Sequence, residues 1–193
     1  MSQIQNLFST PIQEVFIDEE ITKKVQDIVL PRLDKLANLD TEIYSNPTGT
    51  DYFIERIFKP EDYEEFFDLM AKHGSEFCKQ VGFQTGPRMN WWVQDYRQGG
   101  KHRRHNHGAS RVSGVFWIRA NEAAGDLVLE NPNAAFQYLD HSEINPLGEY
   151  TKVHHFIKPA TGKLVLFPSY INHEASESLT GVERTIFAFN LDL

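Results

Sequence analysis

The chain has 193 residues, of which 40% are hydrophobic and 24% are charged, a composition typical of one soluble globular domain. Asp and Glu number 27 against 19 Lys and Arg, so the formal net charge is −8. This balance argues against a general nucleic-acid binder, because phosphate contacts need a basic face. Cys78 is the single cysteine, so no internal disulfide can form, and we expect a reducing, intracellular (cytoplasmic) compartment. No apolar run approaches the roughly 20 residues that span a bilayer, so we expect no membrane partner.

The N-terminal part of the chain predicts one strand and two helices. Residues 11–17 predict a short opening strand. The acidic residues 18–20 then start an amphipathic helix, which we expect Pro31 to interrupt. A second helix is predicted over about 60–81, where apolar side chains recur at helical spacing. Cys78 lies on this helix, and we expect it to pack in the core rather than to react.

From residue 88 onward the pattern changes to short β segments separated by turns rich in Gly, Pro and Asn. The predicted strands are 89–96, 111–118, 126–130, 136–139, 153–157, 163–167 and 184–191. Several of them are apolar without alternation, which is typical of a sheet covered on both faces. We therefore predict a mainly β protein with N-terminal helices and a jelly-roll core. One domain is expected over 1–193, with supporting elements in 1–87 and the β core in 88–193.

The densest group of polar candidates for chemistry lies in residues 96–107. In an extended chain His105 and His107 point to the same face, with their Cα atoms roughly 7 Å apart, so both imidazoles can reach one metal ion. His173, which follows an apolar strand and Pro168, is the best-placed third donor. Imidazole suits Fe, Zn, Cu or Ni, so the ligand type does not choose the metal. A solvated basic turn with a separate core histidine is the alternative.

Arg184 opens the last predicted strand, which is otherwise apolar. Burying an arginine there is costly unless it meets an anion, and its planar guanidinium favours a carboxylate or a phosphate. The alternative is a structural salt bridge to one of the many acidic residues.

Three further features bear on a pocket. Trp91 and Trp92 alternate along the first core strand, so we expect one in the core and the other at a substrate entrance. His154 and His155 are adjacent and would face opposite ways on a strand, so we expect neither to bind a metal. The polar residues 140–150 are long for a hairpin connection and predict a lid.

Taken together, these motifs resemble the prolyl 4-hydroxylase-like iron(II)/2-oxoglutarate dioxygenases. The segment that carries the resemblance best is Tyr96-x-x-Gly99-Gly100-x-His102-x-x-His105-x-His107. The segments at 113–117 and at Gly162-x5-Pro168 followed by His173 resemble the later strands of that family, and Arg184 stands where its basic residue holds the far carboxylate of 2-oxoglutarate. The segments 7–11 and 189–190 further resemble a small branch found in phage and bacterial genomes.

The resemblance implies a double-stranded β-helix, Fe(II) held by His105, His107 and His173, and a cosubstrate, 2-oxoglutarate, held by Arg184 and the Tyr96 hydroxyl. It also implies that O₂ is consumed, that an unidentified substrate is hydroxylated, and that succinate and CO₂ are released. A protein side chain, a nucleobase or a small molecule would each suit as the substrate. A phage-encoded enzyme would act in the cytoplasm of its host.

One difference from the family matters, because His107 replaces the usual carboxylate ligand. Two imidazoles and one carboxylate partly neutralise Fe(II), whereas three neutral imidazoles leave both of its charges. Asp95 and Glu130 are possible substitute carboxylates.

Two other functions compete with this interpretation. Gly99-x5-His105-x-His107 also matches the start of a cupin signature, so a three-histidine metal protein or dioxygenase that does not use 2-oxoglutarate is the first alternative. The glutamate of that signature is missing from residues 108–112, and a cupin has no need of Arg184. A non-enzymatic jelly-roll module is the second alternative.

Overall fold

The computed structural model describes residues 9–39, 57–84, 88–96, 99–133, 152–178 and 183–192. Two helices, α1 (Glu19–Leu39) and α2 (Glu64–Val81), and a short 3₁₀ turn, η1 (Pro60–Asp62), precede most of the strands. The strands are β1 (Gln13–Phe16), β2 (Met89–Tyr96), β3 (His102–His105), β4 (Val112–Arg119), β5 (Leu127–Glu130), β6 (His154–Ile157), β7 (Lys163–Pro168), β8 (His173–Ala175) and β9 (Arg184–Leu191).

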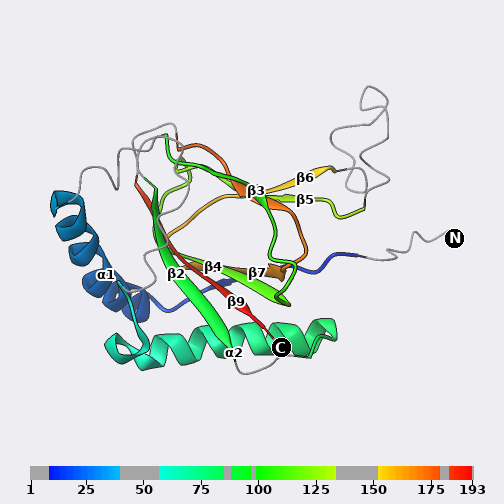
Figure 1. Cartoon of the computed structure of the whole chain (residues 1–193), viewed down its shortest axis with the longest axis horizontal. Helices are drawn as coiled ribbons and strands as arrows, with labels where there is room; N and C mark the ends of the chain where they lie inside the picture. Colours follow the sequence, from blue (N-terminus) through cyan, green and yellow to red (C-terminus); the bar gives the residue numbers. More distant parts are fainter. Residues whose placement is uncertain are drawn as a thin grey trace, which may run out of the picture.

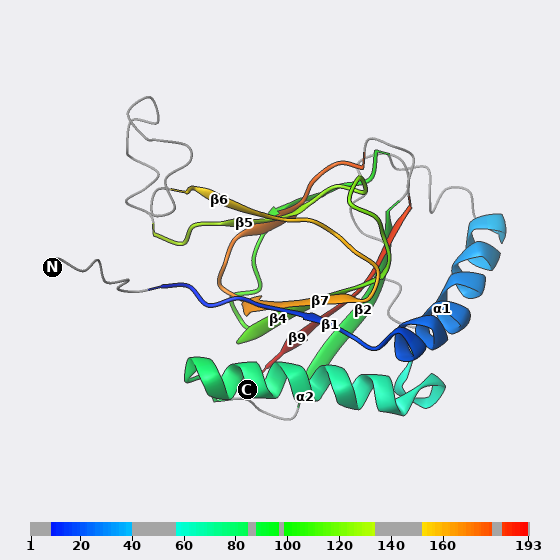
Figure 2. The same ribbon diagram turned by 180° about the vertical axis from the view of Figure 1, so that it is seen from behind.

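The strands form two antiparallel sheets that face each other (Figure 1). The larger sheet has the order β1-β7-β4-β9-β2, and the smaller has the order β3-β8-β5-β6. Both helices lie against the outer face of the larger sheet, as the view from behind also shows (Figure 2). The larger sheet is therefore covered on both faces, and this confirms the predicted mainly β jelly roll with N-terminal helices.

The hydrophobic core has two parts, one on each face of the larger sheet. Between this sheet and the helices, the ring of Phe66 on α2 meets that of Phe187 on β9 edge to face, with 5.1 Å between ring centroids. Between the two sheets, Trp117, Phe167 and Ile186 belong to a second buried cluster. Since side chains alternate along a strand, β9 directs one row of residues to the helices and the other row, which begins with Arg184, to the space between the sheets.

The first helix corrects the sequence prediction, because α1 continues through Pro31 to Leu39. Proline removes one helical hydrogen bond and normally ends or kinks a helix. Here the exposed Pro31 faces away from the core, while Val29 before it and Leu33 after it are fully buried on one stripe. Arg32 also forms a two-pronged ion pair with Asp62, both bonds being 2.7 Å long. Packing on both sides of the proline holds the second half of the helix in place.

Most predicted strands are confirmed, with bounds that differ by at most two residues. The exceptions are β3 and β8, which the sequence pattern did not predict, and the predicted strand at 136–139 and lid at 140–150, which lie outside the described residues. Cys78 is buried as expected. The division into 1–87 and 88–193 stays a prediction.

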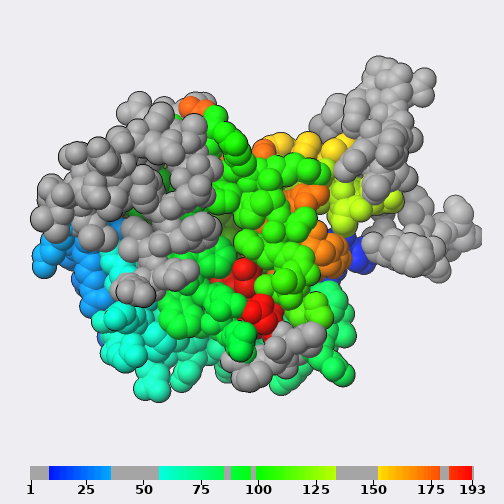
Figure 3. Space-filling model, in the orientation of Figure 1, coloured from blue at the N-terminus to red at the C-terminus, as the bar shows by residue number. Residues whose placement is uncertain are grey.

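The space-filling view shows the blue atoms of α1 at the left and the cyan atoms of α2 below, both packed against the rest of the molecule (Figure 3). Within the described ranges, neither helix combines the length and apolar character needed to cross a membrane.

Candidate metal and cosubstrate site

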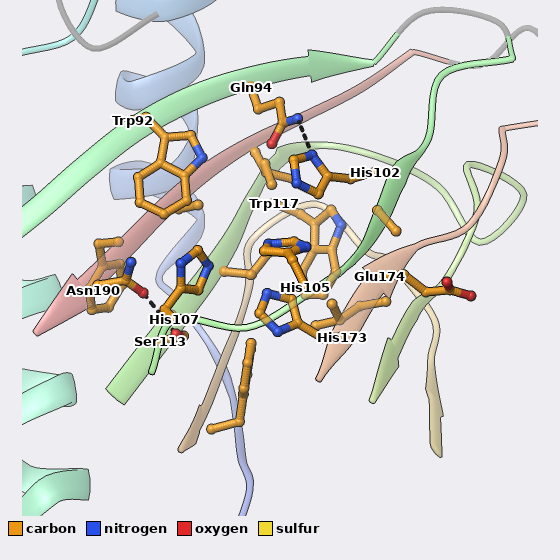
Figure 4. A pocket seen from close by; sticks show the side chains of 18 of the residues that line it. Trp92, Gln94, His102, His105, His107, Ser113, Trp117, His173, Glu174 and Asn190 are labelled. Atoms are coloured by element: carbon orange, nitrogen blue, oxygen red, sulfur yellow. Dashed lines mark hydrogen bonds between the residues drawn. The ribbon is translucent and has the colours of Figure 1, made fainter. Parts of the chain in front are cut away.

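Three histidines meet in the space between the sheets (Figure 4). His105 ends β3 and is paired with His173, the first residue of β8, so that their ring centroids lie 4.2 Å apart. His107 follows two residues after β3, and its ring lies 5.0 Å from that of His105 and 5.2 Å from that of His173. One nitrogen from each imidazole lies within 4.8 Å of the other two, which is close enough for one metal ion to contact all three.

The backbone fixes which nitrogen two of these rings present. Nδ1 of His105 lies 2.7 Å from the carbonyl oxygen of Arg103, and Nδ1 of His173 lies 2.9 Å from that of Ile171. A carbonyl oxygen can only accept, so each Nδ1 carries the proton and each Nε2 keeps its lone pair for another partner. His107 is held through its backbone N–H, which donates to the Ser169 carbonyl at 2.9 Å. The two Nδ1 contacts orient their rings as outer hydrogen bonds orient metal ligands, and the backbone contact positions the segment that carries His107.

Burial keeps the three imidazoles neutral. Desolvation, together with a smaller effect of the nearby histidines, lowers the pKa of His173 to about 3 and that of His107 to about 4. Desolvation also lowers the pKa of His105. At neutral pH all three rings are therefore neutral imidazoles, the form that binds metal ions through the nitrogen without a proton.

Neither substitute carboxylate reaches this group. Asp95 faces the other side of β2, where it accepts a 2.6 Å hydrogen bond from Thr185, and Glu130 is paired with Arg104. Glu174 lines the same cavity, but its carboxylate points away from the three rings (Figure 4). Among the described residues, the donor group thus consists of three imidazoles without a carboxylate.

Arg184 and Tyr96 line the same cavity and are direct partners across β9 and β2. The guanidinium carbon of Arg184 lies 4.2 Å from the centroid of the Tyr96 ring. Its Nη1 and Nη2 donate to the carbonyl oxygens of Gly125 at 2.6 Å and Ser176 at 3.1 Å. Gly125 is required there, because a Cβ would lie 2.4 Å from the Ser176 oxygen and its φ is +85°.

The buried Arg184 is short of negative partners. Within the described ranges it forms no ion pair, its Nε has no hydrogen-bond partner, and burial lowers its pKa. The alternative considered for Arg184, a structural salt bridge to an acidic residue, is therefore not formed within those ranges. Burial also raises the pKa of Tyr96, so its hydroxyl stays protonated and can donate. A positive guanidinium and a phenol in a cavity suit an anionic ligand such as a carboxylate.

The comparisons with known proteins agree with this chemistry. A family model described as "Putative 2OG-Fe(II) oxygenase" matches residues 90–190, which is more than half of the chain. The chain belongs to this family. Members of the 2-oxoglutarate–Fe(II) oxygenase family are oxidoreductases that use Fe(II), 2-oxoglutarate and O₂. The histidines and the arginine described above fit these groups by their chemistry, namely unprotonated imidazoles for the iron and a desolvated guanidinium for a carboxylate. A search of curated proteins found no match.

Solved structures of oxygenases have the same fold as this family member. A prolyl-4-hydroxylase from Pseudomonas putida is 15% identical over 95% of this chain and 88% of its own, with a TM-score of 0.62. A prolyl hydroxylase from Trichoplax adhaerens, in complex with a hypoxia inducible factor peptide fragment, is 16% identical over 94% and 83%, with a TM-score of 0.60. HygX from Streptomyces hygroscopicus, with nickel and 2-oxoglutarate bound, is 9% identical over 95% and 83%, with a TM-score of 0.58. The resemblance to prolyl 4-hydroxylase-like enzymes is confirmed, and the phage and bacterial branch stays a prediction.

Gln94, Ser113 and Asn190 line the cavity but were not predicted as part of the site. Trp92 had been one of two candidates for the entrance, whereas Gln94, Ser113 and Asn190 carried no motif for chemistry. Strand alternation would have found Gln94, because it lies between Trp92 and Tyr96 on the same face of β2.

Trp91 packs on Phe67 in the core, with 5.3 Å between ring centroids, while Trp92 lines the cavity. His102 lies beside His105 and contacts Gln94, its Nδ1 being 3.1 Å from the Gln94 amide nitrogen. His154 and His155 are exposed on β6 and lie outside the metal-binding group.

Proposed function

We propose that this oxygenase hydroxylates an unidentified substrate and converts 2-oxoglutarate to succinate and CO₂, with His105, His107 and His173 as the iron ligands. The observation that carries the proposal is the meeting of three neutral imidazoles, two of them oriented by backbone carbonyls, in one cavity with the buried Arg184. When bound, the iron and O₂ supply the oxidising chemistry. The chain supplies ligands, orientation and a site shielded from water.

Each residue has a separate task in this proposal. The three imidazoles would hold the iron, those of His105 and His173 through Nε2, because their Nδ1–H groups donate to backbone carbonyls and keep the rings in position. Arg184 binds the distal carboxylate of 2-oxoglutarate, and the protonated Tyr96 hydroxyl donates to the same group. The apolar side chains of Val115, Leu127 and Ile186 line this cavity, along with other residues. They exclude water, which strengthens the pairing between guanidinium and carboxylate.

The charge of the ligand set supports the use of a dianionic cosubstrate. Three neutral imidazoles leave Fe(II) with a charge of +2, and 2-oxoglutarate brings −2. The two negative charges of 2-oxoglutarate therefore balance the charge of the iron, which the usual carboxylate ligand balances only in part. We expect its affinity to depend more strongly on ionic strength than in a site with one carboxylate ligand.

The three-imidazole set also favours a second candidate, the cupin-type dioxygenase that does not use 2-oxoglutarate. Arg184 distinguishes the two, because only the first candidate requires an anion beside this guanidinium. The family match supports the first candidate, and its oxidoreductase chemistry argues against a non-enzymatic jelly roll. One similar structure holds a hypoxia inducible factor peptide fragment, and another is the carbocyclase SnoK from nogalamycin biosynthesis, so we regard a peptide and a small molecule as the two substrate classes to test.

Substitution of His107 tests the ligand set. Mn(II) affinity is measured by electron paramagnetic resonance, and succinate is measured after aerobic incubation with Fe(II) and 2-oxoglutarate. We expect His107→Ala to weaken Mn(II) binding at least tenfold and His107→Asp to retain binding and raise succinate formation. His154→Ala, which changes an exposed histidine on β6, is the control and should change neither. Unchanged Mn(II) binding by His107→Ala would remove His107 from the ligand set, and metal binding without any 2-oxoglutarate consumption would favour the cupin-type enzyme.

A further inference from the structure

A chain of buried hydrogen bonds fixes the side chain of Asn190 at the edge of the cavity. Asn190 on β9 is the direct partner of Ser113 on β4, and Ser169 follows β7 on the other side of β4. The Ser113 hydroxyl lies 2.7 Å from Oδ1 of Asn190 and 2.9 Å from the Ser169 hydroxyl. All three residues are at least nine-tenths buried, so these contacts are shielded from water.

The hydroxyl protons can be arranged in only one satisfactory order. Ser169 is fully buried, and its hydroxyl proton has one partner among the described residues, the oxygen of Ser113. Ser113 must then donate its own proton to Oδ1 of Asn190. The reverse order would leave the Ser169 proton without an acceptor, at the cost of an unmade buried hydrogen bond. Oδ1 of Asn190 therefore accepts the Ser113 hydroxyl proton, and the two N–H donors of the same amide remain for a ligand.

These donors lie next to a proposed metal ligand and an aromatic ring. Figure 4 shows the amide nitrogen of Asn190 on the side of Trp92 and the oxygen on the side of Ser113. The Trp92 ring lies 5.7 Å from the His107 ring, between centroids. Ser169 connects the two parts, because its carbonyl accepts the His107 N–H while its hydroxyl begins the chain to Asn190. The position of the donors is thus tied to that of the metal site.

This end of the cavity lies away from the residues proposed for the cosubstrate. Arg184 and Tyr96 are six and four residues from Asn190 and Trp92 along β9 and β2, respectively. Among the described residues that line the cavity, the charged side chains are Arg184 and Glu174, and Glu174 points away. The part of a ligand that enters beside Trp92 and Asn190 therefore meets an aromatic face and hydrogen-bond donors, with no counter-charge.

We propose that Trp92 and Asn190 are the specificity-determining residues for the substrate, which presents a planar, uncharged ring carrying a carbonyl oxygen. The ring stacks on Trp92, and the oxygen accepts from the Asn190 amide. This inference rests on the proposed function, because the metal at the three histidines marks the place of reaction. A charged group in the same position would lose its hydration without gaining an ion pair.

Three probes of nearly equal shape test the proposal, namely benzamide, benzoate and benzamidinium, which are neutral, anionic and cationic. Binding is measured as paramagnetic broadening of their ring protons by Mn(II) in the whole protein saturated with 2-oxoglutarate. We expect benzamide to bind at least tenfold more tightly than either ion. Asn190→Ala and Trp92→Ala should each weaken benzamide binding about tenfold, Ser113→Ala less, and Trp92→Phe should retain most of it.

Two further variants make the test specific. Asn190→Asp keeps the acceptor for Ser113 but replaces the free donors with a carboxylate, so the preference should change from benzamide to benzamidinium. Asn90→Ala is the matched control, because Asn90 is the cross-strand partner of Asn190 but donates to Asp192 instead of lining the cavity. It should leave benzamide binding unchanged.

The possible failures can be told apart. Loss of Mn(II) binding in His173→Ala, measured without any probe, supports the metal site independently. If Mn(II) does not bind to the histidines, the proposed function fails. If Mn(II) binds but the three probes bind equally, or if the Asn190 variants bind benzamide like the unchanged protein, the specificity proposal is overturned.

Discussion

Replacing Arg184 with methionine separates a cosubstrate-binding role from a structural one. The side chain donates to two carbonyl oxygens, and losing both hydrogen bonds costs about 2 kcal/mol at about 1 kcal/mol each. The same change removes a desolvated charge that forms no ion pair within the described ranges, and methionine keeps an apolar contact with Tyr96. We therefore expect the free energy of unfolding of the metal-free protein to fall by no more than about 2 kcal/mol.

The effect on 2-oxoglutarate should be much larger. Truncating one partner of a buried, charge-assisted pair costs about 2–4 kcal/mol, which is about a 30- to 700-fold loss of affinity. Titration calorimetry of 2-oxoglutarate into the anaerobic Mn(II) protein measures this loss, and urea unfolding measures stability. Arg104→Met is the control, because Arg104 is largely exposed on β3 and pairs with Glu130. A structural role would give the opposite pattern. The free energy of unfolding would fall by about 3–5 kcal/mol, and the affinity for 2-oxoglutarate would change less than about threefold.

Three other predictions concern stability. The pKa of His107 and His173 is lowered on folding, to about 4 and about 3, so the unfolded chain binds more protons below pH 6.5. The free energy of unfolding of the metal-free protein should thus reach its full value above about pH 6.5 and decrease as the pH falls toward 4. His107→Ala should reduce this slope in urea titrations, and an unchanged slope would refute the assignment. Gly114→Ala places a Cβ 2.3 Å from ring atoms of Phe189, so urea unfolding should show a loss of about 1–3 kcal/mol, and no loss would mean that the ring moves freely. Pro31→Ala restores a helical hydrogen bond in α1 and should stabilise the protein by about 1–2 kcal/mol in the same assay, whereas destabilisation would show that the proline suits its helix.

The sequence predicted the proposed metal site better than it predicted the elements that build the site. The spacing of His105 and His107 placed both imidazoles on one side, and the motif with His173 supplied the third. The strands that carry them, β3 and β8, are only four and three residues long and largely polar, so they lack the apolar alternation by which strands are recognised. Only the pairing of these two strands brings His105 opposite His173.

The residues proposed to select the substrate could not be found by local patterns. Ser113, Ser169 and Asn190 are separated by 56 and 77 positions, counted from Ser113, and meet because β7, β4 and β9 are neighbours in the larger sheet. In the sequence, each is a lone polar residue near the end of a strand, where polar residues are common. The continuation of α1 past Pro31 likewise depends on the packing of Leu33 and on the distant Asp62, which outweigh the local preference of proline.

Anaerobic addition of Fe(II) and then 2-oxoglutarate, followed by visible absorption spectroscopy, tests the central claim most directly. The account predicts that the iron binds once per chain and that 2-oxoglutarate then gives the weak charge-transfer band of its chelate. The band should disappear in His173→Ala, and in Arg184→Met it should need far more 2-oxoglutarate. Iron binding without this band at any 2-oxoglutarate concentration would contradict the assignment of the cavity to an iron and its keto-acid cosubstrate.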